Sequence, residues 1–133
     1  MCIRDRHHQQ QIRDAVGATP ASDPAWLHAV LVVALRGLPH AYRHTPAVTG
    51  TTLALEIDGD AGGVWTLRRD AERWTLWGSA PDSGESARIL MSDDTAWRLL
   101  FNALPARRTG DVALAHGDPA LLGALLAARS VIV

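Results

Sequence analysis

The feature that most constrains this chain is a run of three segments, between residues 51 and 77, in which apolar and polar side chains alternate. Residues 52–57 read TLALEI, so every second side chain is leucine or isoleucine. A period of two places successive side chains on opposite faces of a β-strand. Residues 64–69 and 73–77 repeat this period with tryptophan and leucine, and short turn-forming stretches separate the three segments. The sequence therefore predicts a three-stranded meander with one apolar face.

The indoles lie on one face of this predicted meander. Trp65 and Trp74 each precede a leucine by two residues, whereas Thr66 and Thr75 occupy the intervening positions. Side chains two apart share a face, so aromatic and aliphatic groups gather on one side of the sheet and polar groups on the other. The apolar side must be covered by other elements, and helices are the expected cover.

The rest of the chain supplies further strands and two helices. The expected elements are a strand at 87–91, a helix at 92–104, a strand at 111–115 and a helix at 117–126. Ser92 or Asp93 is the expected cap of the first helix, and Asp118 with Pro119 opens the second. This order of elements predicts an α+β fold, with an antiparallel sheet of about five strands and helices packed on one face.

A further helix is expected before the sheet. Asp23 is a suitable N-cap, and apolar residues follow it at intervals of three and four until Pro39 ends the pattern. Such an apolar stripe must be buried against another element. Residues 7–16 are expected to form the end of an earlier helix, and residues 18–22 a linker.

Composition argues against several classes of function. A formal net charge of -1 provides no positive field for nucleic acid or an anionic membrane. No apolar run reaches the ~18–20 residues that a membrane span requires. Cys2 is the single cysteine, so neither a disulfide framework nor a thiolate metal cluster is expected, and a cytoplasmic location follows. The expected partner is a small molecule.

Four segments occur together in a characteristic order. They are GVWTLRR at 63–69, RWTLW at 73–77, DTAWRLLF at 94–101 and GDPALL at 117–122. In order and spacing they resemble the C-terminal domain of the mycothiol-dependent maleylpyruvate isomerase family, a fold similar to sterol carrier protein 2, over roughly residues 50–133. HHQQQIRDAVG at 7–17 is similar to the end of that family's N-terminal domain, a DinB-like four-helix bundle.

This resemblance implies a division of the chain into three parts. Residues 1–22 are the expected remnant of the bundle with its linker, residues 23–50 a connecting amphipathic helix and loop, and residues 51–133 the C-terminal α+β domain. Residues 1–6, MCIRDR, resemble the read-through of a sequencing adapter. The chain is therefore expected to be the tail of a longer protein whose bundle domain is missing; the alternative is a native, frayed amino terminus.

The resemblance also implies a metal and a thiol cofactor in the full-length parent. The family's bundle holds a divalent metal, expected to be zinc, through two His and a Glu, and mycothiol is the thiol. His7, the first of the His-His pair, matches one ligand. The Glu position, four residues earlier, is Ile3 here, and the other His would precede Met1. Neither cofactor is expected to bind this chain tightly on its own.

Arg98 is the candidate catalytic residue. Its guanidinium can bind an anionic substrate such as a dicarboxylate. The alternative is a surface pair with Asp94, one helical turn earlier. For His7 and His8 the alternative to metal binding is a solvated pair at a helix end. His40 and His44 have the spacing of a helix face, but the prolines around them favour a loop.

Two functions follow from these patterns. The first is the C-terminal part of a mycothiol-dependent isomerase or transferase, inactive alone. The second is a non-catalytic module that holds a small apolar ligand between sheet and helices. Trp65, Trp74, Trp77 and Trp97 either line such a cavity or fill the core. The sequence identifies neither the substrate nor the reaction.

Overall fold

A computed structural model describes residues 12, 15–16, 24–82, 84–101 and 114–128. The expected linker at 18–22, most of the expected helix end at 7–16 and the part of the expected helix beyond residue 101 lie outside these residues. The elements, in chain order, are α2 (Pro24–Leu35), α3 (Leu38–Ala41), β1 (Thr52–Asp58), β2 (Gly63–Arg69), β3 (Trp74–Trp77), β4 (Ala87–Ser92), α4 (Asp93–Leu100), β5 (Leu114–Gly117) and α5 (Pro119–Ala127).

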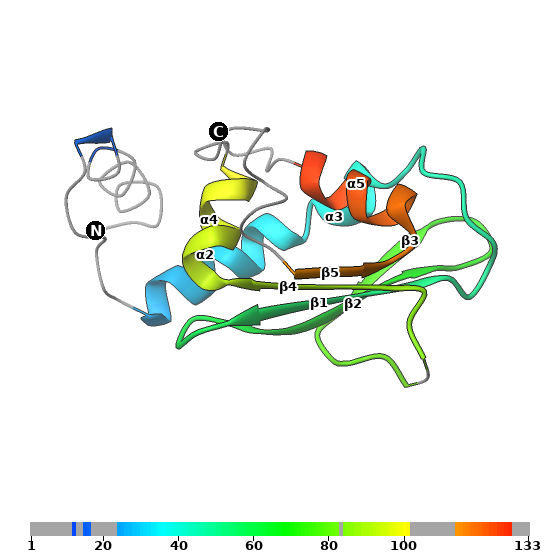
Figure 1. The fold of residues 1–133 in the computed structure, drawn as a ribbon, viewed down its shortest axis with the longest axis horizontal. Helices are drawn as coiled ribbons and strands as arrows, with labels where there is room; N and C mark the ends of the chain where they lie inside the picture. The colour runs from blue at the N-terminus through cyan, green and yellow to red at the C-terminus, as the bar shows by residue number, and fades with distance from the viewer. Residues whose placement is uncertain (1–11, 13–14, 17–23, 83, 102–113, 129–133) are drawn as a thin grey trace.

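The five strands form one sheet in the order β3-β2-β1-β4-β5. β1 and β2 pair antiparallel, with Leu55 opposite Trp65. At the two edges, β2 pairs antiparallel with β3, and β4 pairs antiparallel with β5. Helices α2, α3, α4 and α5 lie on one side of this sheet (Figure 1). The predicted α+β fold with helices on one face is confirmed, with one difference. The sheet is mixed, because β1 and β4 run parallel, with Leu55 opposite Ile89.

The parallel pair results from the connection between β3 and β4. Residues 78–82 and 84–86 belong to this connection, which runs from one edge of the sheet, across the face opposite the helices, to the far side of β1 (Figure 1). Thr66 Oγ1 donates a hydrogen bond to the Ser79 carbonyl (2.7 Å), and the Ser86 N–H donates to the Thr52 carbonyl (2.9 Å). β3 ends opposite Thr66, and β4 begins at nearly the same height along the strand direction. A short irregular segment is therefore enough to connect the two strands. Strand order in space therefore departs from order in the sequence.

One core joins the sheet to the helices. Leu55 on β1 and Trp97 on α4 are both buried in it, and so are Leu31 and Leu35 of α2. The apolar stripe predicted for the helix before the sheet is therefore packed on the same core. The division of the chain at residue 51 stays a prediction, although α2 and α3 share the core of the residues that follow.

Side-chain caps begin the two helices that follow strands. Ser92 Oγ accepts a hydrogen bond from the Thr95 N–H (3.1 Å) at α4, and the Asp118 carboxylate accepts one from the Ala120 N–H (2.9 Å) at α5. Both predicted starts are confirmed. The expected helix end at Pro39 differs from the structure. α2 ends earlier, and Pro39 lies in the first turn of α3, where its missing N–H leaves no helical hydrogen bond unmade.

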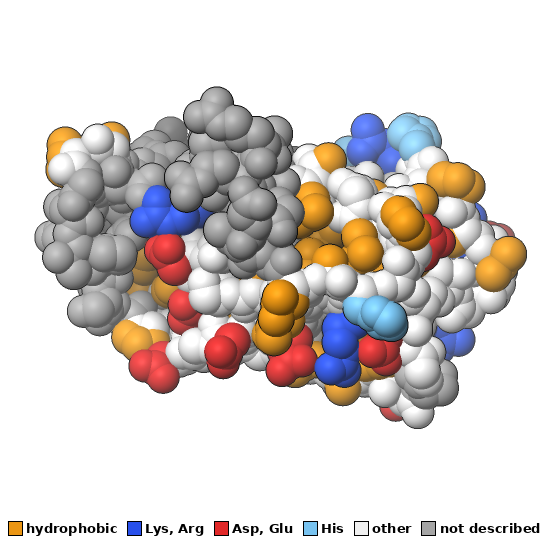
Figure 2. All heavy atoms as spheres, viewed as in Figure 1, with side chains coloured by type: hydrophobic (Ala, Val, Ile, Leu, Met, Phe, Trp, Pro, Cys, Tyr) orange, Lys and Arg blue, Asp and Glu red, His pale blue; other side chains and the backbone are white. Residues whose placement is uncertain are grey.

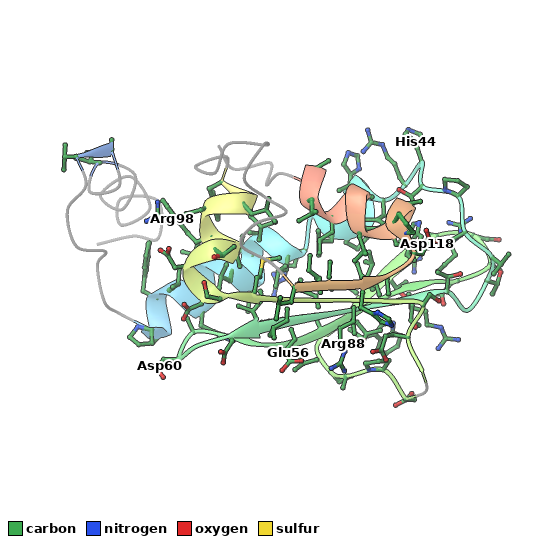
Figure 3. The ribbon with its side chains drawn as sticks, in the orientation of Figure 1. His44, Glu56, Asp60, Arg88, Arg98 and Asp118 are labelled. Carbon is green, nitrogen blue, oxygen red and sulfur yellow. The ribbon has the colours of Figure 1, made fainter. Side chains whose placement is uncertain are left out.

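The sheet face opposite the helices is polar and charged. Arg88 lies near two carboxylates, with N–O distances of 3.5 Å to Glu56 and 2.9 Å to Glu85. Figure 3 shows Glu56 and Arg88 pointing away from the helices. In Figure 2, acidic side chains lie along this side, and basic side chains join them towards the right of the view. Among the described residues, no helix combines the length and the apolar character needed to cross a bilayer.

Candidate functional site

A groove of about 730 Å³ lies beside β3, which is an edge strand of the sheet among the described residues. We call it the β3 groove. Part of its lining is apolar or aromatic, and consists of Val32, Pro39, Trp65, Trp74 and Leu76. Sites for small molecules usually enclose about 300–1,000 Å³ and are lined in this way. The size and lining of the groove therefore suit a small ligand.

The groove exists because the helical cover of the sheet is uneven. α4 packs on β1 and β4, and α5 packs on β4 and β5, whereas the helix beside β3 is the four-residue α3. A single helical turn covers little of a strand, so the inner side of β3 is only partly shielded. Leu76 is half-buried although it points to the same face as the buried Trp74.

The helical wall of the groove follows one line of side chains. Val32, Arg36, Pro39 and Arg43 are spaced by four, three and four residues, which is the spacing of one helix face. The backbone turns at Gly37 between α2 and α3, but these four side chains still line the same groove.

Two aromatic rings anchor the base of the groove. The Trp74 indole N–H donates to the Thr45 carbonyl (3.4 Å), and its ring meets Tyr42 edge-on at 5.1 Å. Tyr42 is buried, and its hydroxyl donates to the Leu121 carbonyl in α5 at 2.6 Å. Burial raises the pKa of Tyr42 above its ordinary value of 10.0, and a hydrogen bond with the Leu125 backbone offsets this only in part. Tyr42 thus ties the groove to α5.

Charged side chains surround the apolar lining. Arg36, Arg43, Arg69 and Arg73 all line the groove, together with the exposed Glu72. Within the described residues none of the four guanidinium groups forms an ion pair, and Arg43 Nη1 donates only to the His40 carbonyl (2.7 Å). The groove is therefore positively charged at neutral pH.

Over the centre of the sheet, the space between strands and helices is filled; this is one part of the region in which the sequence placed an alternative ligand cavity. The gap there encloses about 10 Å³ among apolar side chains that include Leu55, Met91 and Leu99. A single water molecule needs a probe-sized void of about 10–15 Å³. No ligand fits at this place among the described residues without repacking the core.

Arg98, the candidate catalytic residue, lies on α4 and not in the β3 groove (Figure 3). Its Nε lies 2.8 Å from Asp94 Oδ2, and its guanidinium lies 6.0 Å from the centre of the Trp97 ring. Burial raises the pKa of Asp94, and the neighbouring Asp93 carboxylate adds to this effect. The structure therefore contains the pair that the sequence offered as the alternative, and a catalytic role for Arg98 stays a prediction.

The histidines do not form a metal centre within the described residues, where no three His, Cys, Asp or Glu side chains come together. His28 Nδ1 lies 2.9 Å from the Ala61 carbonyl, and its ring lies 6.2 Å from Trp65. His40 lies in α3, which the sequence had placed in a loop, and His44 is exposed. His7, the predicted metal ligand, lies outside the described residues.

The indoles divide between the core and the surface. Trp65, Trp74 and Trp97 are buried, as the core interpretation predicted, and the first two also line the groove. Trp77 differs: it is 54% exposed on the opposite face, where its indole N–H donates to Thr75 Oγ1 (3.0 Å). There it borders a second, more polar hollow of about 310 Å³.

Comparisons with known proteins add a similarity of fold. No protein-family model matches the chain, and no curated protein matches it. Among solved structures, it is similar to one described as "UbiJ-SCP2 Ubiquinone synthesis protein", with a TM-score of 0.47 and 16% identity over 78% of this chain and 90% of that chain. The likeness is weak, so the fold assignment depends on this chain's own strand order and register.

Sequence reasoning did not identify the four groove arginines as a set. Arg69 ends β2 and Arg73 lies in the turn just before β3, whereas Arg36 and Arg43 lie more than twenty residues earlier. The one available signal was the helical spacing from Val32 to Arg43, which the assumed helix end at Pro39 concealed.

Proposed function

We propose that this chain is a binding module for a small molecule with an apolar body, and that the ligand lies in the β3 groove. The observation that carries this proposal is the contrast between a groove of about 730 Å³ and an interior gap of about 10 Å³. Val32, Pro39 and Leu76 line the groove and are only half-buried, so their exposed apolar surface loses contact with water when a ligand covers it. Each Å² of apolar surface removed from water contributes about 25 cal/mol.

A neutral fluorescent probe tests this proposal. N-phenyl-1-naphthylamine is apolar, uncharged and strongly fluorescent only away from water, so titrating it into the protein reports an apolar site. We expect saturable binding of the probe to the folded protein. Native mass spectrometry of the purified protein provides a second measurement, because a bound small molecule adds a defined mass.

A matched pair of variants locates the binding. Val32 lines the groove, whereas Val33 is the next residue of α2 and does not. Val32→Trp fills part of the groove and should weaken probe binding by about tenfold or more, a change of about 1.4 kcal/mol. Val33→Trp adds the same side chain elsewhere and should leave binding unchanged. Equal effects of the two variants, or no saturable binding to the unmodified protein, would contradict the proposal.

A mycothiol-dependent isomerase or transferase with a divalent metal remains a proposal for a longer parent protein. Its support is the motif resemblance at residues 63–69, 73–77, 94–101 and 117–122. The predicted ligand His7 lies outside the described residues. The test is the reading frame upstream of Met1: a His and a Glu at the spacing of a helical bundle would support this proposal, and their absence there would remove it.

A further inference from the structure

We infer that the ligand of the β3 groove carries an anionic group on its apolar body, and that the groove arginines recognise this group. The inference rests on the proposed function, because it specifies the chemical class of the ligand for the same groove. Carboxylate, sulfonate and phosphate groups share the required chemistry, since each presents oxygen atoms that a guanidinium can bind in pairs.

The pairing of the arginines carries the inference. The described residues include seven arginines, and they divide according to position. The three outside the groove each have a carboxylate close by: Arg68 at 3.5 Å from Asp70, Arg88 at 2.9 Å from Glu85 and Arg98 at 2.8 Å from Asp94. The four that line the groove have no carboxylate within ion-pair distance among the described residues: Arg36, Arg43, Arg69 and Arg73.

Within the described part of the chain, the one carboxylate that lines the groove leaves all four of these arginines unpaired. Glu72 lines it and lies in the same turn as Arg73, yet it pairs with neither Arg69 nor Arg73. Four guanidinium groups beside one carboxylate repel one another, and a hollow with apolar walls screens this repulsion less well than open water does. An anion from outside the chain relieves the repulsion.

The lining and volume of the groove indicate that the rest of the ligand is apolar and small. Val32, Pro39 and Leu76 are half-buried and offer apolar surface to the same groove as the arginines, so a fully charged polymer would leave that surface without a partner. The formal net charge of the whole chain is -1, which does not favour a nucleic acid. The volume of about 730 Å³ suits a drug-sized molecule. An amphiphilic anion satisfies both the apolar surface and the charges.

Two probes that differ only in charge test the inference. 8-Anilinonaphthalene-1-sulfonate has the same ring system as N-phenyl-1-naphthylamine, with one sulfonate added. We expect the sulfonate probe to bind the protein about tenfold more tightly, and this preference to shrink severalfold between about 0.02 M and 0.5 M salt as the charges are screened. Near-ultraviolet circular dichroism confirms that the protein stays folded, since the sulfonate probe also binds loosely packed states.

Charge-removing variants assign the preference to the groove. Arg36→Gln combined with Arg73→Gln removes two exposed charges from the groove with little loss of packing. The double variant should bind the sulfonate probe about tenfold more weakly, whereas its affinity for the neutral probe should change less than twofold. Arg88→Gln also removes an arginine charge, but on the opposite face of the sheet, and should change the affinity for neither probe.

The outcomes separate this inference from the proposed function. If both probes bind with equal affinity, or if Arg88→Gln weakens the sulfonate probe as much as the groove variant does, the inference is overturned while the proposed function stands. If neither probe binds, the proposed function fails and the inference with it. If an extended acidic peptide binds and both probes do not, the groove is a peptide site and the small-molecule class is wrong.

Discussion

The helices cover one face of the sheet, and they cover its centre more completely than its edge at β3. Over β1 and β4, the leucine-rich surfaces of α4, α5 and α2 close on the strands and leave a gap of about 10 Å³. Beside β3, the cover is reduced to α3, and a groove of about 730 Å³ remains. The same sheet therefore supports a dense core at its centre and a binding site at its edge. Space for a ligand arises where the sheet extends beyond its helices.

The largest expected effect compares one leucine from each region. Leu99 is buried on α4 and lines the interior gap, whereas Leu76 is half-buried in the groove. Leu99→Ala should lower the free energy of unfolding by about 3 kcal/mol, because a packed core cannot close the new cavity. Leu76→Ala should cost about 1 kcal/mol, in proportion to the smaller area it buries. Urea denaturation measures both, and equal losses would contradict the contrast in packing.

Tyr42 lies at the boundary between the two regions, and its hydroxyl is the next test. Tyr42→Phe keeps the ring contact with Trp74 but removes the hydrogen bond to the Leu121 carbonyl. A buried acceptor that loses its donor costs about 1–3 kcal/mol. We expect the variant to be less stable by roughly that amount in thermal or urea denaturation. Unchanged stability would indicate that a water molecule reaches the Leu121 carbonyl and replaces the hydroxyl as its donor.

The raised pKa of Tyr42 adds a dependence on pH with a definite sign. The folded protein holds the phenolic proton to higher pH than the unfolded chain does, so this contribution to stability is complete below pH 10.0 and is lost as the pH rises above it. The loss approaches about 1.4 kcal/mol per pH unit. Tyr42 is the only tyrosine and the chain has no lysine, so Tyr42→Phe should abolish most of this alkaline loss. The same alkaline loss in both proteins would contradict burial of Tyr42.

A smaller effect is expected at the cap of α4, which helps to close the interior. Ser92→Ala removes the acceptor of the Thr95 N–H and should cost about 1 kcal/mol. Ser92→Asn keeps a capping oxygen and should restore stability. Amide hydrogen exchange should accelerate in the first turn of α4 in the alanine variant and leave the amides of β3 unchanged. Faster exchange in both regions would show that they open together.

The smallest effect is expected at Arg98. Its pair with Asp94 is one helical turn apart and partly exposed, so Arg98→Gln should cost about 0.5 kcal/mol or less. Asp94→Asn should cost no more. Because Arg98 does not line the groove, probe binding should stay unchanged. A loss of probe binding as large as that of the groove arginine variant would break the division between the two regions.

Much of the fold followed from the order of residues. The period of two at 52–57 predicted β1, the caps at Ser92 and Asp118 predicted the starts of α4 and α5, and the alternation around Trp65 and Trp74 predicted which face is buried. Each of these features depends on residues that are close together in the sequence, within one or two helical turns or within neighbouring strands. Local geometry alone determines such features.

The parallel pairing of β1 with β4, the groove and the state of its arginines were decided only by the tertiary structure. The connection between β3 and β4 sets the strand order by crossing the sheet, and that order leaves β3 at an edge with a single helical turn beside it. Which guanidinium meets a carboxylate then depends on distances in space between residues far apart in the chain. A periodic pattern fixes the face on which a side chain lies, but not the neighbour that packing brings to it.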